Sequence, residues 1–329
     1  MTKKNEVVIG IGLIFLEVSL LFALFSFIPS NVIAGIGNPN TTVITLLEIG
    51  NVYPDVIYVD IDGGAASVTL TPNDTTTVTC TGVVRDYNGD ADVTSANATL
   101  YGLTSSSFGD SNDNNYHYQN TSCELIADTG DYAGFTDDPY HSLANCTFEV
   151  EYYANPETWV CNITANDTMY WTDTNESTII ISQLLALGLP DTINYGRVNA
   201  TFVSNENVTN ITNYGNVEIN ISLEGYGVTQ GDGLAMNCTL GNIGTIDIMY
   251  EKYNLSTTTA GDISLSVFES TYTNLSTTPE IKEFNLNYRT NDTVNKAINA
   301  SYWRIYVPIG VAGTCNGSII FGATTAAGS

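Results

Sequence analysis

The sequence predicts an all-β protein of two tandem β-sandwiches, which follow an N-terminal hydrophobic segment and a β-prone strand. Its 329 residues are enough for two domains. Only 13% of the residues are charged and the chain is rich in Tyr, while Thr, Val and Ile supply the β-branched side chains that favour pleated sheets. Turn signals divide these residues into short segments at the spacing typical of a sandwich, and beyond the N-terminal segment no apolar stripe keeps a helical period for three turns.

The charge balance restricts the partners of the chain. Lys and Arg total 9 against 35 Asp and Glu, which gives a formal net charge of −26. A surface of this sign repels nucleic acid and anionic lipid headgroups and attracts divalent cations. We therefore expect no nucleic-acid partner.

Residues 1–34 have the pattern of a secretory signal peptide. A short basic start precedes an apolar run over residues 7–28, which only Glu17 interrupts, and Val32-Ile33-Ala34 fits a small-residue cleavage site. The alternative is a membrane anchor that is retained, in which Glu17 near mid-bilayer costs roughly 3 kcal/mol unless it is paired. The membrane is then a partner only through residues 7–28.

A third interpretation of this segment comes from Gly12, which Leu13-Ile14-Phe15-Leu16-Glu17 follows. This order resembles the type IV pilin pattern, with Gly before the cleavage point and Glu at the fifth mature position. In that family the hydrophobic helix forms the filament core. The chain departs from the pattern because no charged residue adjoins Gly12.

Residues 35–66 contain a β-prone stretch, TTVITLLEIGNVYPDVIYVDID, which Gly50 and Pro54 divide into two short strands. An apolar strand needs a sheet to complete. It either pairs within its own domain or adds to a neighbouring subunit as a donor strand. The candidate polymerisation residues are Val43, Ile44, Leu46, Leu47, Ile49, Val56, Ile57 and Val59.

Residues 67–168 form the first predicted sandwich, 169–190 a linker, and 191–329 the second sandwich. The strands expected in the first sandwich are Ser67–Thr71, Thr77–Arg85, Ala98–Leu103, Tyr116–Ile126, Cys146–Tyr153 and Thr158–Ala165. Within the linker, Ser177–Gly188 is apolar and fits either a strand or a short helix. The strands expected in the second sandwich are Arg197–Val203, Asn216–Leu223, Leu234–Leu240, Ile246–Tyr253, Ile263–Phe268, Ile281–Tyr288, Ala300–Val307 and Gly317–Gly322.

The six cysteines all lie beyond the N-terminal segment, and their even number indicates three disulfides in an oxidising compartment. Alternation along two strands places Cys80 and Cys161 on buried faces, so we expect them to pair across the first sandwich. The remaining expected pairs are Cys123–Cys146 and Cys238–Cys315. Six cysteines formally allow about 15 connectivities. No Cys-x-x-Cys occurs, which disfavours zinc.

Asn-x-Ser/Thr triplets are the most frequent motif of the chain. The 35 Asn include 18 triplets of this kind, where chance gives roughly 7. They begin at Asn40, Asn73, Asn97, Asn120, Asn145, Asn162, Asn166, Asn175, Asn199, Asn207, Asn210, Asn220, Asn237, Asn254, Asn274, Asn291, Asn299 and Asn316. Since an N-glycan must point into solvent, the triplets predict a secreted glycoprotein whose flat faces carry sugar.

A candidate ion site lies at Asp86, Asn88, Asp90 and Asp92, where oxygen side chains at alternate positions resemble the start of a calcium loop. The alternative is a hairpin turn at Asn88-Gly89. No cofactor other than Ca²⁺ is expected. The chain has only two His and none of the short motifs of hydrolases or nucleotide-binding enzymes, so we expect no enzyme and no catalytic residue.

Two stretches carry a family resemblance: the strand Trp159-Val160-Cys161-Asn162-Ile163-Thr164 and the ending from Ser301-Tyr302-Trp303-Arg304 to Cys315-Asn316-Gly317. They resemble archaeal secreted cell-surface proteins with Ig-like or jelly-roll-type β-sandwiches. In such families these domains serve as surface-layer units, pilus or thread subunits, or adhesins, and the filament members resemble donor-strand pili.

These observations favour a structural subunit of a heavily N-glycosylated extracellular filament, polymerising by donor-strand or other head-to-tail contacts at the cell surface. Its expected partners are other copies of itself and covalent N-glycans. The alternatives are a surface-layer or membrane-anchored adhesin and a type IV pilin-like subunit.

Overall fold

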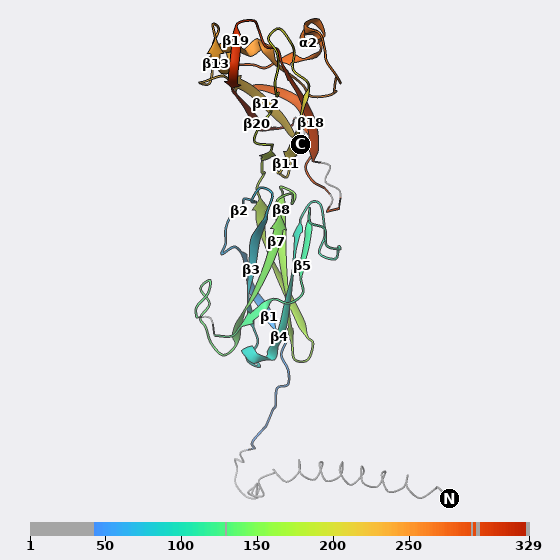
Figure 1. Cartoon of the computed structure of the whole chain (residues 1–329). Coiled ribbons are helices and arrows are strands. Elements are labelled where there is room, and N and C mark those ends of the chain that lie inside the picture. Colours follow the sequence, from blue (N-terminus) through green and yellow to red (C-terminus); the bar gives the residue numbers. More distant parts are fainter. Residues whose placement is uncertain (1–42, 129, 291, 294–296, 327–329) are drawn as a thin grey trace, which may run out of the picture. The chain divides into compact units, whose positions relative to one another are not determined.

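The computed structural model describes residues 43–128, 130–290, 292–293 and 297–326. It is nearly all β, with 49% strand and 5% helix, and its strands form two sandwiches (Figure 1). The predicted all-β class is confirmed. Residues 51–329 form one compact unit that holds both sandwiches, and residues 1–50 form another.

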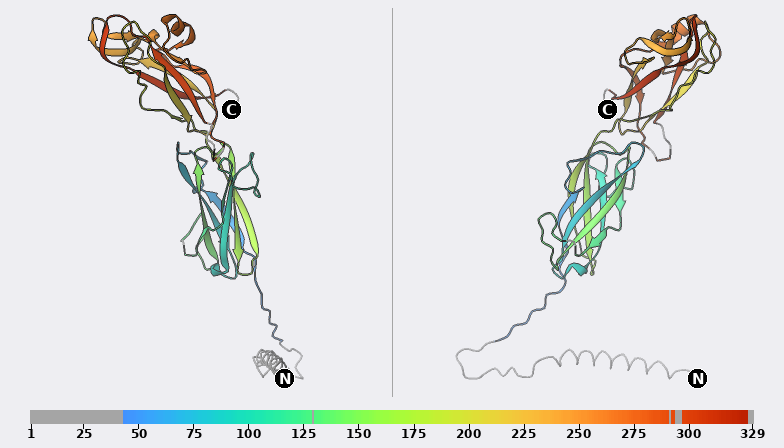
Figure 2. Two further views of the ribbon diagram at one scale, coloured as in Figure 1. Left: turned by 45° about the vertical axis from the view of Figure 1, so that its right-hand side comes forward. Right: turned by 60° about the vertical axis from the view of Figure 1, so that its left-hand side comes forward.

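The first sandwich consists of a four-stranded and a five-stranded sheet. In both views of Figure 2 its strands, blue to yellow-green, lie side by side. The four-stranded sheet has the order β1 (Asp55–Ile61), β3 (Thr75–Arg85), β7 (His141–Glu151) and β6 (Glu124–Ile126). The five-stranded sheet has the order β2 (Ser67–Val68), β9 (Thr172–Ile181), β8 (Thr158–Asp167), β4 (Val93–Gly102) and β5 (His117–Asn120).

Two-residue alternation explains why these segments form a sandwich. In β7 every second side chain is buried from Ser142 to Val150, so one face of the strand points into the core. The core surrounds Trp159 of β8, which is fully buried and donates its indole N–H to the Asn155 carbonyl at 2.9 Å. Apolar burial of this kind contributes about 1.5–3 kcal/mol for each large side chain.

The second sandwich is built from three sheets. The first has the order β10 (Leu187–Gly188), β11 (Asn207–Asn213), β18 (Ile298–Ile305), β15 (Glu251–Asn254) and β16 (Thr273–Asn274). The second has the order β17 (Glu280–Leu286), β12 (Ile219–Tyr226) and β20 (Ser318–Thr325). The third has the order β14 (Thr245–Asp247), β13 (Leu234–Gly241) and β19 (Val311–Asn316).

The last two sheets continue each other along the chain. Strands β19 and β20 are separated by Gly317 alone, where a Cβ would lie 1.8 Å from the Ala235 carbonyl oxygen, so only glycine fits. β20 pairs with β12 and β19 with β13. The C-terminal strands therefore form one edge that runs along both sheets.

Two predicted boundaries are wrong. The predicted N-terminal segment 35–66 overlaps the first sandwich, because β1 lies within these residues and pairs with β3 of the sandwich. The linker 169–190 is also too long: β9 pairs with β8 along its length and β10 belongs to the second sandwich. Polar residues on the exposed face of β9 gave this strand the composition of a linker.

Four expected strands differ as well. Ile246–Tyr253 is not one strand, because the 3₁₀ turn Ile248–Tyr250 separates β14 in one sheet from β15 in another. Tyr116–Ile126 is not one strand, because the chain leaves β5 in one sheet and enters β6 in the other. Ile263–Phe268 contributes instead to helix α2 (Leu265–Thr271), which Ser264 caps by accepting a hydrogen bond from the Val267 N–H. Arg197–Val203 forms no strand, and only Val203 makes an isolated bridge, with Tyr306.

The structure contains the three expected disulfides. Cys80 of β3 is bonded to Cys161 of β8, which joins the two sheets of the first sandwich. Cys123 is bonded to Cys146 within the same domain. Cys238 and Cys315 face each other on β13 and β19 and are bonded. In the chain-entropy model a loop as long as the first or third contributes roughly 4 kcal/mol.

A buried arginine organises the second sandwich. Arg304 of β18 is fully buried, and its guanidinium donates to the Tyr272 hydroxyl and to the carbonyls of Ser204, Thr259 and Gly261. The Glu206 carboxylate lies 4.0 Å from it. One side chain thus ties β18 to two irregular segments and to the end of α2.

We predict that Arg304→Met lowers the free energy of unfolding of the second sandwich by about 3–5 kcal/mol, because it leaves the three carbonyls without their donor and the Glu206 carboxylate without its counter-charge. Urea-induced unfolding measures the change. Arg197→Met, at an exposed arginine, is the control. Equal unfolding midpoints for the two variants would contradict the assignment.

Candidate functional site

Residues 43–50 expose a run of large apolar side chains to solvent. The exposed fractions are 76% for Val43, 75% for Ile44, 93% for Leu46, 86% for Leu47 and 75% for Ile49. The segment is assigned to no helix or strand. Five neighbouring apolar side chains at this exposure form a surface that typically marks an interaction site.

The other predicted polymerisation residues lie elsewhere. Val56 and Val59 are buried and Ile57 is half-buried, all three in β1. Because β1 already pairs with β3, these residues complete their own sandwich, and their assignment to a donor strand is wrong. The Val56 N–H and carbonyl are also satisfied, by the side chains of Asp173 and Asn175.

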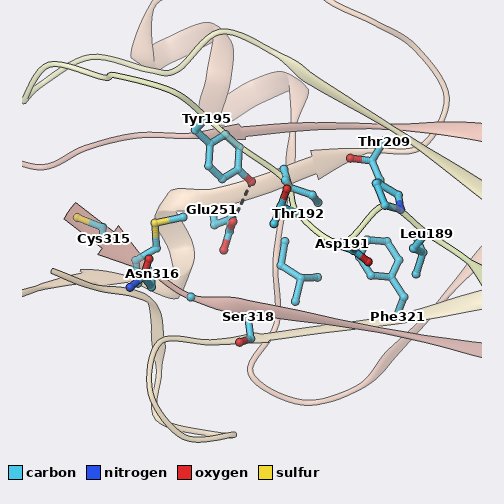
Figure 3. Close-up of a pocket in the computed structure, with 15 residues that line it drawn as sticks. Leu189, Asp191, Thr192, Tyr195, Thr209, Glu251, Cys315, Asn316, Ser318 and Phe321 are labelled. Atoms are coloured by element: carbon cyan, nitrogen blue, oxygen red, sulfur yellow. Dashed lines mark hydrogen bonds between the residues drawn. The ribbon is translucent and has the colours of Figure 1, made fainter.

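A groove lies in the second sandwich between the chain segment 189–200 and the edge formed by β19 and β20 (Figure 3). It comprises two adjoining cavities of about 430 and 940 Å³. The residues that line both are Thr192, Ile193, Tyr195, Met236, Cys315 and Asn316. We call it the C-terminal groove; no sequence pattern pointed to it, since its walls are over 100 residues apart in the chain.

One wall of the C-terminal groove is a sheet edge. Within the described residues β20 pairs only with β12 and β19 only with β13, so their other sides face no strand. The opposite wall, residues 189–200, is assigned to no helix or strand. Such edges present backbone N–H and C=O groups that can pair with an added strand.

One titratable pair lies inside this groove. The Tyr195 hydroxyl donates to the Glu251 carboxylate at 2.8 Å, and Glu251 is only 2% exposed (Figure 3). Burial raises the pKa of Glu251 to about 7, although the Tyr195 hydrogen bond opposes the shift. The groove therefore contains a carboxyl group whose charge changes near neutral pH.

An acceptor asparagine must be accessible to carry a glycan, and the described acceptors are exposed or half-buried with one exception. Asn40 and Asn291 lie outside the described residues. Asn145, Asn162, Asn237 and Asn316, which neighbour cysteines, are half-buried or exposed. Among the described acceptors only Asn220 is buried, at 8% exposure. Whether any acceptor carries a glycan stays a prediction.

Asn220 has a structural role in β12. Its Oδ1 accepts hydrogen bonds from the N–H groups of Phe284 and Asn285 at 2.8 and 3.0 Å. These residues lie where the register of β12 with β17 shifts, so the side-chain amide replaces the missing ladder partner.

The predicted ion site is partly assembled. Carboxylate oxygens of Asp86 and Asp92 lie within 4.8 Å of each other and of Asp167, which the sequence did not single out because it is distant in the chain. Asn88 points elsewhere and accepts the Val52 N–H at 2.7 Å, and Asp90 is not part of the cluster. The Asn88-Gly89 turn is also present, since the Gly89 N–H donates to the Asp86 carbonyl.

The two histidines lie on different strands. His117 is fully buried in β5, and His141 begins β7 with its Nδ1 2.8 Å from Asp138. Neither has a serine or cysteine nucleophile within hydrogen-bond reach among the contacts of the described residues.

The predictions for the signal peptide, the membrane anchor and the type IV pilin-like helix fall on residues 1–34, outside the described residues. Among the residues that are described, no helix has the length and apolar character needed to cross a membrane. The three disulfides are consistent with an extracellular protein.

No protein-family model matches the chain, and no curated protein matches its sequence. A solved chaperone–tip adhesin complex of CFA/I fimbriae is 12% identical, covers 78% of this chain and 77% of its own, and has a TM-score of 0.29. The CsuC-CsuE chaperone–tip subunit complex of Acinetobacter baumannii Csu pili is 9% identical, covers 78% and 96%, and has a TM-score of 0.34. TM-scores this low transfer neither fold detail nor function to this chain.

We predict that native protein carries no glycan at Asn220, because a sugar on its buried amide is incompatible with the β12–β17 pairing. Glycopeptide mass spectrometry measures occupancy site by site, and the exposed acceptors Asn73 and Asn210 are the comparison. An Asn220 that is occupied in folded protein would contradict this placement of the side chain.

Glu251 predicts a pH dependence of stability. Its folded pKa of about 7 exceeds its ordinary value of 4.5, so its stabilising contribution is complete below pH 4.5 and is lost as the pH rises through 7. We expect Glu251→Gln to remove this loss, at most about 3 kcal/mol. Urea unfolding at pH 5 and pH 8 measures it, with the exposed Glu283→Gln as control. A variant that keeps the wild-type pH slope would refute the assignment.

Proposed function

We propose that this chain is a structural, non-enzymatic subunit of an N-glycosylated extracellular filament, in which residues 43–50 of one copy dock into the C-terminal groove of the next. The observation that carries the proposal is the exposure of Val43, Ile44, Leu46, Leu47 and Ile49, which lies between 75% and 93%. Burying each of these side chains contributes about 1.5–3 kcal/mol.

The first sandwich does not use this segment. β1 begins at Asp55 and pairs with β3, while the Asp173 and Asn175 side chains of β9 bind the outer backbone groups of Val56. Within the first sandwich the outer backbone groups of Val56 therefore already have partners.

The C-terminal groove suits such a partner in length and chemistry. An extended segment of the seven residues 43–49 spans about 23 Å, and the eight residues of β20 span about 26 Å. Ile193, Met236 and Ile319 supply apolar contacts along the groove. Added backbone hydrogen bonds to the free edge of β20 would give affinity, and side chains entering the cavity would give register.

Charge also favours this segment as the joining surface. The whole chain carries a formal net charge of −26, which opposes association of two copies. Residues 43–50 contain only one charged side chain, Glu48. Docking through this segment thus brings only one charged side chain of the segment, Glu48, into the contact between two acidic molecules.

Contact between one segment and a groove at a different place on the next copy is heterologous, and it gives an open polymer when the rotation does not close. Glycans on the exposed acceptors of the sheet faces would oppose lateral association. Two acceptors, Asn199 and Asn316, line the groove itself. The proposal therefore requires that both Asn199 and Asn316 be free of glycan in assembled protein.

We predict that the double substitution Leu47→Asp with Ile49→Asp abolishes polymerisation and leaves folded monomers, because it removes two apolar contacts and places two carboxylates in a groove that already holds Asp191 and Glu251. Electron microscopy and size-exclusion chromatography measure assembly. Val228→Asp, at another exposed apolar residue (60%), is the matched control and should assemble like wild type.

Filaments of wild-type length from the double variant would exclude residues 43–50 as the joining segment. A deletion test should remove only these residues, since removing Asp55–Ile61 takes a strand from the first sandwich. A synthetic peptide of residues 41–51 should bind the monomeric variant in a 1:1 ratio and compete with assembly of the wild type.

A further inference from the structure

Three carboxylates from separate segments meet at one end of the first sandwich. Asp86 directly follows β3, Asp92 ends the short 3₁₀ turn 90–92, and Asp167 ends β8. Their nearest oxygen atoms all lie within 4.8 Å of one another. Asp86 and Asp167 are fully buried.

One oxygen of each carboxylate is held by the protein. Asp86 Oδ1 accepts the Asn88 N–H at 2.8 Å, Asp92 Oδ1 accepts the Thr168 hydroxyl, and Asp167 Oδ1 accepts the Met169 and Trp171 N–H groups. These contacts fix the orientation of all three side chains.

The remaining oxygens of two members have no partner. Asp86 Oδ2 and Asp92 Oδ2 are buried and make no hydrogen bond within the described part of the chain. None of the three carboxylates forms an ion pair with a Lys or Arg among the described residues. An unpaired buried charge is costly, and three together repel each other.

We propose that Asp86, Asp92 and Asp167 bind one Ca²⁺ ion. Ca²⁺ takes oxygen ligands at about 2.3–2.6 Å, so two ligands of one ion lie at most about 5 Å apart, as these do. No His or Cys belongs to the cluster, which disfavours zinc. Ligands contributed by three separate segments suit the irregular coordination of Ca²⁺ better than the octahedron that Mg²⁺ requires.

The same loops hold the chain where it enters the first sandwich. Asn51 Nδ2 donates to Asp167 Oδ2 at 2.5 Å, the Val52 N–H donates to Asn88, and the Tyr53 ring stacks on Trp171 with centroids 4.2 Å apart. An ion in the cluster would therefore cross-link the ends of β3 and β8 and stabilise residues 51–53. This inference stands without the filament proposal, because it concerns a site within one chain.

The test uses the full chain, stripped with EDTA and titrated with Ca²⁺ by calorimetry. We expect one site per chain and a rise in melting temperature with Ca²⁺ concentration. Tb³⁺ should replace Ca²⁺ and luminesce on excitation of Trp171, whose backbone N–H donates to Asp167 Oδ1. Asp92→Asn should weaken binding about tenfold or more, because the affinity of such sites follows ligand charge.

Asp90→Asn is the matched control, since it removes the same charge two residues away from Asp92 and outside the cluster. It should leave the Ca²⁺ affinity unchanged. If Asp90→Asn and Asp92→Asn weaken binding equally, Ca²⁺ binds only the diffuse negative charge and the site is refuted. Absence of binding at millimolar Ca²⁺ also overturns it, and displacement by equimolar Mg²⁺ overturns the choice of ion.

Asp86→Asn provides a second readout that needs no ion. It removes a buried negative charge, so this variant should be at least as stable as the wild type in EDTA and should lose the stabilisation by Ca²⁺. An Asp86→Asn protein that is less stable than wild type in EDTA and still stabilised by Ca²⁺ contradicts the proposal.

Discussion

Every backbone N–H and C=O group at a strand edge needs a hydrogen-bond partner. The rest of this structure depends on that constraint. In the first sandwich the outer edge of β1 meets it through Asp173 and Asn175, whose side chains bind Val56. In the second sandwich the outer edges of β19 and β20 face no strand within the described residues. Side chains therefore supply partners to part of the outer edge of β1, whereas the outer edges of β19 and β20 have no strand partner among the described residues.

Asparagine is the residue that most often meets this constraint. Asn213 Nδ2 binds the carbonyls of Val217 and Leu286, Asn216 binds Ala154, Ser182 and Leu184 between the two sandwiches, and Asn220 fills the shift in the β12–β17 register. All three are buried. An amide offers donors and an acceptor without charge, so it can replace a ladder partner inside a domain. The abundance of Asn thus has a structural cause besides glycosylation.

Composition and turn spacing were enough to predict the all-β class. Local alternation predicted the Cys80–Cys161 disulfide, because it places both residues on inward faces of facing strands, and the other two pairs followed from the cysteines that remained. It could not decide where β1 pairs: Val43–Ile49 and Val56–Val59 look alike in sequence, and only tertiary contacts separate the exposed from the buried half. Polar β9 was taken for a linker because its outer face is solvated. Asp167 was missed because it joins Asp86 only after β3 and β8 are placed, and the C-terminal groove for the same reason.

The buried position of Asn220 links two events in the life of the chain. The triplet Asn220-Ile221-Ser222 is accessible to a glycosyltransferase only while the chain is unfolded, whereas exposed acceptors such as Asn73 stay accessible after folding. A sugar on Nδ2 of Asn220 would have to lie inside the β12–β17 pairing, where Oδ1 of the same buried amide accepts the N–H groups of Phe284 and Asn285. Glycan occupancy at Asn220 would therefore report whether a chain met the transferase before or after it folded. A chain that folds first is protected from a modification that would prevent β12 from pairing with β17.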